Sequence, residues 1–81
     1  MDKDNLILNI NKIHTTIMGI DRIKKNLKIE VDDVIDYLVK KIENPNSIVY
    51  KNGKNYYVEI ANIIITINSY SYTIITAHIK K

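Results

Sequence analysis

The two histidines, His14 and His78, are the residues best suited to proton transfer in this chain. Imidazole gives or takes a proton near neutral pH, so a pair of histidines can serve as general base and general acid. Cleavage of an RNA phosphodiester needs both roles, because one group activates the 2′-hydroxyl and the other protonates the leaving oxygen. Arg22, the only arginine, would hold the scissile phosphate through a bidentate contact.

A second group of polar residues gathers toward the C-terminus, on what alternation predicts to be the open face of a sheet. Threonine and asparagine can hydrogen-bond a phosphate, tyrosine rings can stack on a base, and a glutamate adds another acid or base. The residues predicted for this face are Tyr57, Glu59, Thr66, Asn68, Tyr72, Thr76 and His78. Ser71 and Thr73 fall on the predicted core face, and would orient substrate only if a β-bulge near residues 69–71 turned them outward.

Several of these residues also have a structural interpretation. His14 falls where the first predicted helix ends, a position that suits partial positive charge. The open face of any antiparallel sheet is polar, and threonine and tyrosine are favoured in strands for packing reasons alone. No ligand spacing supports a metal site built from His14, Glu59 and His78, so we expect neither metal nor cofactor.

The elements that must position these residues divide at Pro45. Before it, apolar residues recur at helical spacing, and Thr15, Thr16 and Gly19 interrupt the pattern. We therefore predict helices over residues 4–14 and 17–27, with one bent helix as the alternative. A third helix, over residues 31–43, has acidic residues early and lysines late, as the helix dipole favours.

After Pro45 the period changes to two, and four strands are predicted, over residues 47–51, 55–60, 63–68 and 71–79. Asn52-Gly53 marks a type I′ hairpin turn. In the last strand Ile75, Ala77 and Ile79 are predicted to face the core. The sequence thus predicts an α+β fold, with two or three N-terminal helices packed on one face of a four-stranded antiparallel meander.

Composition limits the alternatives. The 81 residues suit a single domain over 1–81, and the net charge of +3 is compatible with nucleic acid without indicating it. There is no cysteine, and neither a signal-like N-terminus nor an apolar run long enough for a membrane is visible. We expect a cytoplasmic bacterial protein without a membrane partner.

Three segments resemble a small bacterial family of unknown function, and the resemblance extends over nearly the whole chain. They are His14-Thr15-Thr16-x-x-Gly19-x-x-Arg22-Ile23-x-x-Asn26-Leu27, Gly53-Lys54-Asn55-Tyr56-Tyr57 and Ile65-Thr66-Ile67-Asn68-x-x-Ser71-Tyr72-Thr73-Ile74-Ile75-Thr76-Ala77-His78. This resemblance implies a family and brings no activity with it.

A more distant resemblance is to the barnase–EndoU–colicin–RelE group of small metal-independent ribonucleases. It rests on helices followed by an antiparallel sheet, and on the ending Ile74-Ile75-Thr76-Ala77-His78. BrnT-type toxins in that group carry a comparable ending with an arginine where His78 stands. The resemblance implies RNA cleavage, with a cationic or proton-transferring group at that position.

Two functions are therefore expected from the sequence. The first is a metal-independent endoribonuclease or an RNA-binding protein, such as a toxin or a phage or anti-phage effector. It would use His14 and His78 as the acid/base pair, with Arg22 and Thr76 beside them. The alternative is a non-catalytic protein-binding module, an inhibitor or adaptor that acts through the open face or an edge strand. Monomer and homodimer both remain open, because the meander has two edges.

Overall fold

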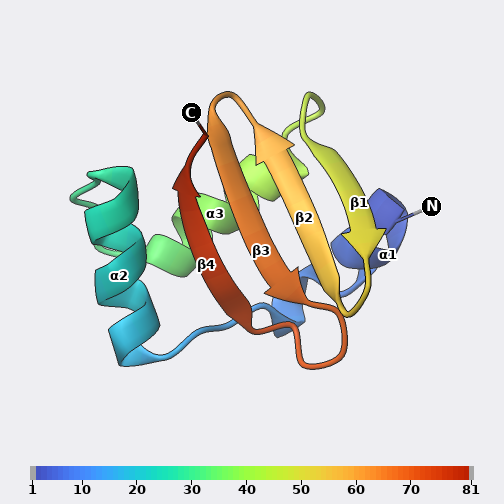
Figure 1. Ribbon diagram of the computed structural model, residues 1–81, viewed down its shortest axis with the longest axis horizontal. Helices are drawn as coiled ribbons and strands as arrows, with labels where there is room; N and C mark the ends of the chain where they lie inside the picture. The colour runs from blue at the N-terminus through green and yellow to red at the C-terminus, as the bar shows by residue number, and fades with distance from the viewer. Residues whose placement is uncertain (1, 81) are drawn as a thin grey trace.

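The computed structural model describes residues 2–80, and it confirms an α+β fold in which the helices precede an antiparallel sheet (Figure 1). The sheet has four strands in the order β1-β2-β3-β4, a meander in which chain neighbours are also sheet neighbours. The elements are α1 (Asp2–Leu8), the 3-10 turn η1 (Ile10–Lys12), α2 (Ile17–Leu27), α3 (Val34–Glu43), β1 (Ile48–Asn52), β2 (Asn55–Ile60), β3 (Ile63–Asn68) and β4 (Ile74–Ile79).

The boundaries of α2 follow from its end residues. Thr16 caps the N-terminus, where its side chain accepts a hydrogen bond from the backbone nitrogen of Gly19 at 3.0 Å. Lys28 ends the helix in the left-handed conformation, with φ 57°. The predicted range 17–27 matches α2.

The other two predicted helices differ at their boundaries. The range 4–14 is wrong in its second half, because α1 ends at Leu8 and the chain then passes through η1 into an extended segment at His14. The range 31–43 begins too early, because Asp33 caps α3 by accepting a hydrogen bond from the Asp36 nitrogen at 2.9 Å.

The hairpin between β1 and β2 also differs from its prediction. Asn52 pairs with Asn55, so the loop consists of Gly53 and Lys54 rather than the predicted Asn52-Gly53. Gly53 takes a φ of 64° at the first loop position, where glycine is unstrained. The β2–β3 loop places Ala61 in the same region, with φ 54°.

Alternation correctly predicts the core faces of β2 and β3. Tyr56, Val58 and Ile60 are buried, and so are Ile63, Ile65 and Ile67. The α3 helix lies behind the sheet, whereas α2 lies beside β4, along the outer edge of the sheet (Figure 1). The helices therefore cover one face and one edge, rather than one face alone. No helix within residues 2–80 is long and apolar enough to cross a membrane.

In β4 the predicted core row of Ile75, Ala77 and Ile79 is wrong at Ile75. Thr66 pairs with Thr76 and Ile67 pairs with Ile74, so Ile75 is an extra residue in a β-bulge. Ile74 and Ala77 are buried, whereas Ile75 is 47% exposed. Ile79 pairs with the core residue Ile63 and so lies on the core face, although it is 36% exposed at the end of the strand. The bulge lies within the strand, not near residues 69–71, and it exchanges the faces of Ile74 and Ile75.

Candidate functional site

Glu59 and His78 lie in one row across the open face of the sheet. Glu59 of β2 and His78 of β4 both pair with Ile64 of β3, one from each side. Two strand spacings separate their backbones by about 10 Å. An acid and a base at this spacing can flank a single phosphate, as a phosphodiester cleavage requires.

Two neighbours hold the Glu59 carboxylate in place. Lys80 Nζ lies 2.9 Å from Oε1, and the Tyr50 hydroxyl donates to Oε2 at 3.0 Å. The Lys80 hydrogen bond, with a smaller contribution from the Tyr50 hydroxyl, lowers the pKa of Glu59 below its usual value. Glu59 is therefore an oriented carboxylate at neutral pH, and each oxygen keeps a second lone pair for a substrate proton.

The same contacts act on the partners in the opposite direction. The hydrogen bond to Glu59 raises the pKa of Lys80 and, together with desolvation, that of Tyr50. Both partners thus stay protonated as donors to the carboxylate across the neutral range.

A second row on the open face contains the aromatic residues. Tyr50, Tyr57, Thr66 and Thr76 pair in sequence from β1 to β4. The rings of Tyr50 and Tyr57 stack, with centroids 5.5 Å apart. Thr66 is only 7% exposed, so little of it is available to a ligand. The aromatic pair is the part of this row that can stack on a base.

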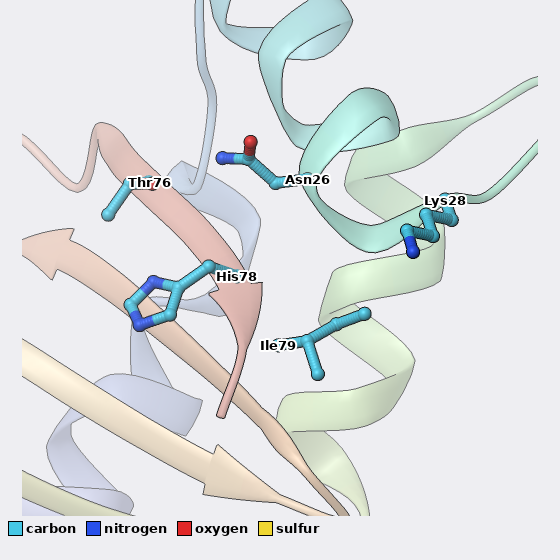
Figure 2. A pocket seen from close by; sticks show the side chains of 5 residues that line it. All are labelled: Asn26, Lys28, Thr76, His78 and Ile79. Carbon is cyan, nitrogen blue, oxygen red and sulfur yellow. The ribbon is translucent and has the colours of Figure 1, made fainter. Parts of the chain in front are cut away.

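A cavity of about 570 Å³ lies between the end of α2 and β4, next to the Glu59–His78 row. Figure 2 shows its lining, in which Asn26 and Lys28 come from the helix side and the other three residues from the strand. The lining residues are Asn26, Lys28, Thr76, His78 and Ile79. His78 belongs to both the row and the cavity, which makes the two parts of one site.

Sequence analysis missed Asn26, Lys28 and Ile79. The Asn26 amide nitrogen donates to the Ala77 carbonyl oxygen at 3.3 Å, so this side chain also attaches α2 to the edge of β4. Asn26 stands in one of the segments that resemble the family of unknown function, but periodicity alone cannot show that its side chain borders a cavity. Lys28 carries no sequence signal beyond its place after a helix.

His14 lies in a different cluster, at the beginning of β4. Its Nδ1 is 2.9 Å from the Lys12 carbonyl oxygen, and its Nε2 is 3.1 Å from Thr73 Oγ1. Because a carbonyl oxygen only accepts, Nδ1 donates, and Nε2 of the neutral ring then accepts from Thr73. The Ser71 hydroxyl lies 2.8 Å from Thr73 Oγ1 and extends the chain of hydrogen bonds.

Backbone contacts reinforce this cluster. His14 and Thr73 form a parallel bridge, in which the His14 nitrogen donates to the Tyr72 oxygen at 3.2 Å and the Ile74 nitrogen donates to the His14 oxygen at 2.8 Å. The structure therefore brings His14, Ser71 and Thr73 together as a junction between the helical half and the sheet.

The structure does not bring His14 and His78 together. From Thr73, the partner of His14, to His78 the strand advances by roughly 15 Å. Arg22 is exposed on α2, one turn before Asn26, and does not line the cavity. The two histidines therefore do not share one site, and the titratable residue that lies in one row with His78 is Glu59.

Tyr72 and Asn68 serve the loop before β4. Tyr72, predicted for the open face, packs against the core instead, with its ring 6.4 Å from that of Tyr56. Tyr72 lies in the loop before β4, with φ 60°, so the alternation of a strand does not assign its face. Asn68 Oδ1 accepts from the backbone nitrogens of Tyr70 and Ser71, both at 2.9 Å, and so orders the loop.

A comparison with protein families matches residues 7–78 to a family described as "Protein of unknown function (DUF3781)". The chain belongs to this family. Neither the curated proteins nor the solved structures contain a match. Membership in DUF3781 therefore brings no activity, and the function of the chain must be argued from its site. Among the described residues, no group of three or more His, Asp or Glu side chains is placed to hold a metal ion.

Proposed function

We propose that this DUF3781 domain cleaves RNA without a metal ion, on the open face of its sheet. The observation that carries the proposal is the shared row of Glu59 and His78, which flank Ile64 at a spacing that suits one phosphate. The nearby cavity supplies Lys28 and Thr76, which can hold phosphate oxygens.

In the proposed reaction Glu59 accepts the proton of the 2′-hydroxyl, and the oxygen attacks the adjacent phosphorus. The bond from phosphorus to the 5′-oxygen breaks, and His78, as imidazolium, donates its proton to that leaving oxygen. The products are a 2′,3′-cyclic phosphate and a free 5′-hydroxyl. Lys28, which lines the cavity with His78, and Lys80, which is bound to Glu59, can stabilise the negative charge.

Cleavage of RNA by the purified protein in EDTA tests the proposal. His78→Ala and Glu59→Gln should each lower the rate by a factor of about 10² to 10⁴, the usual contribution of a general acid or base. Lys40→Ala is the control, because Lys40 is exposed on α3 and pairs only with Asp36 on its own helix. A wild-type protein inactive on tRNA, mRNA and ribosome-bound RNA would contradict the proposal.

A protein-binding module is the second candidate, and the outermost strand β1 favours it. Ile48 is 63% exposed and Tyr50 is 39% exposed. Both lie on the open face, where Ile48 pairs with Glu59 and Tyr50 pairs with Tyr57. Exposed apolar side chains on an edge strand are typical of surfaces that bind another protein. A partner whose binding is lost in Ile48→Asp but kept in His78→Ala would support this function over RNA cleavage.

A further inference from the structure

We infer that the cavity between α2 and β4 binds one nucleotide of single-stranded RNA, beside the linkage that is cleaved. The inference rests on the proposed function and assigns it a substrate subsite. It explains why a histidine of the acid/base row also lines a cavity of about 570 Å³, within the range of about 300–1,000 Å³ that small-molecule sites occupy.

The charge of the lining suits a phosphate group. Lys28 supplies an ammonium group and His78 an imidazole, and none of the five lining residues is a carboxylate. The Thr76 hydroxyl adds a neutral hydrogen-bond donor on the strand side. A phosphate at this place would lie between the helix end and the strand that carries the proposed general acid.

The remaining two lining residues suit a base. Ile79 is 36% exposed and offers an apolar surface to a ring. One hydrogen of the Asn26 amide nitrogen is used on the Ala77 carbonyl oxygen, which fixes the orientation of the amide. The second N–H and the amide oxygen then form an adjacent donor and acceptor, the pattern that reads the edge of an unpaired base.

Lys28 reaches the cavity from an unusual backbone position. It occupies the left-handed C-terminal position of α2, with φ 57°, where glycine is the usual residue because other side chains are strained. The same conformation occurs at Ala61, outside the cavity, so it is the charge of Lys28 and not its φ that supports a binding site.

Binding is tested by titrating ¹⁵N-labelled protein with ribonucleoside 3′-monophosphates and with a single-stranded deoxyribo-oligonucleotide, which lacks the 2′-hydroxyl and cannot be cleaved by this route. We expect shifts of the Asn26 side-chain amide and of the backbone amides of Thr76, His78 and Ile79. Inorganic phosphate is the second arm, and shifts equal to those with nucleotides would overturn the assignment to a nucleotide.

Lys28→Gly and Ala61→Gly form a matched pair of variants. Both remove a residue from a positive φ, 57° and 54°, so both should unfold at a higher denaturant concentration than the wild type. Lys28→Gly should also bind the nucleotide about 10-fold more weakly, because it loses a charge-assisted contact. Ala61 lies in the β2–β3 loop and does not line the cavity, so Ala61→Gly should bind as the wild type does.

The outcomes separate this inference from the proposed function. Unchanged nucleotide affinity in Lys28→Gly, or shifts centred on Tyr57 rather than on the cavity, would overturn the inference even if RNA is cleaved with dependence on Glu59 and His78. Nucleotide binding in the cavity with no RNA cleavage would uphold the subsite and refute the ribonuclease.

Discussion

The Thr15 hydroxyl donates a hydrogen bond of 3.2 Å to the carbonyl oxygen of Ile74, the first residue of β4. Near the other end of α2, the Asn26 amide nitrogen donates to the Ala77 carbonyl oxygen. These two contacts hold the helix along the edge of the sheet and cover polar groups that an edge strand otherwise exposes. The wall of the cavity therefore depends on how α2 docks on β4.

Gly19→Ala should destabilise the protein, although alanine is usually better than glycine in a helix by about 1 kcal/mol. A Cβ at position 19 would clash with Thr15 Oγ1, so the threonine must give up its bond to Ile74. Leaving the Ile74 oxygen without its donor costs about 1–3 kcal/mol, so the free energy of unfolding, measured by urea denaturation, should fall by up to about 2 kcal/mol after the propensity gain is subtracted.

A double-mutant cycle with Thr15→Ala separates this clash from other effects of the substitution. In the Thr15→Ala background the side chain that blocks the new methyl group is gone, so most of the cost of Gly19→Ala should disappear. An equal cost in both backgrounds would show that the Thr15 contact does not explain the glycine.

His14→Ala should lower stability without abolishing the proposed RNA cleavage. The substitution removes the side-chain hydrogen bond to Thr73 and leaves the backbone bridge in place. The loss of that hydrogen bond should lower the free energy of unfolding by about 1 kcal/mol. Urea denaturation measures the first effect, and cleavage assays well below the unfolding midpoint measure the second. If cleavage were lost while stability stayed at the wild-type value, His14 would belong to the reaction after all.

Regular strands explain why the faces of β2 and β3 could be predicted. In both strands every second residue is buried, so a period of two assigns the face of Glu59 correctly. In β4 the bulge adds one residue at Ile75. Because Ile74 and Ile75 are identical in type, the sequence contains no signal that decides which of them faces the core.

The first helix illustrates a different limit. Leu6, Ile10 and Ile13 all pack in or against the core, as their helical spacing predicts. The chain nevertheless changes from α1 to η1 and then to an extended segment, because His14 forms a bridge to Thr73 that only tertiary structure provides. The cavity could not be predicted for the same reason, because its helix wall forms only when α2 lies beside β4.

Glu59→Gln should reduce the dependence of stability on acid pH. The pKa of Glu59 is lowered in the folded protein, mainly by Lys80, so its contribution to stability is complete above the unfolded value near 4.5. That contribution is lost as the pH falls through the lower folded pKa. Urea denaturation between about pH 3 and pH 7 should therefore show a shallower loss of stability in the variant than in the wild type.

Lys80→Gln provides the matched control for this pH dependence. It removes the main cause of the lowered pKa while keeping the carboxyl group, so its acid response should lie between those of Glu59→Gln and the wild type. Identical acid profiles for all three proteins would show that the contact between Glu59 and Lys80 contributes nothing in solution.

Ser47→Ala should lower the free energy of unfolding more than Lys40→Ala does. Ser47 is 5% exposed, and its hydroxyl donates at 2.7 Å to the carbonyl oxygen of Ile42 in the last turn of α3. Without that donor a buried carbonyl oxygen loses its partner, which costs about 1–3 kcal/mol. Lys40→Ala breaks only an exposed ion pair on the same helix and should cost at most about 0.5 kcal/mol. Equal unfolding midpoints for the two variants would mean that water reaches the Ile42 oxygen and replaces the serine.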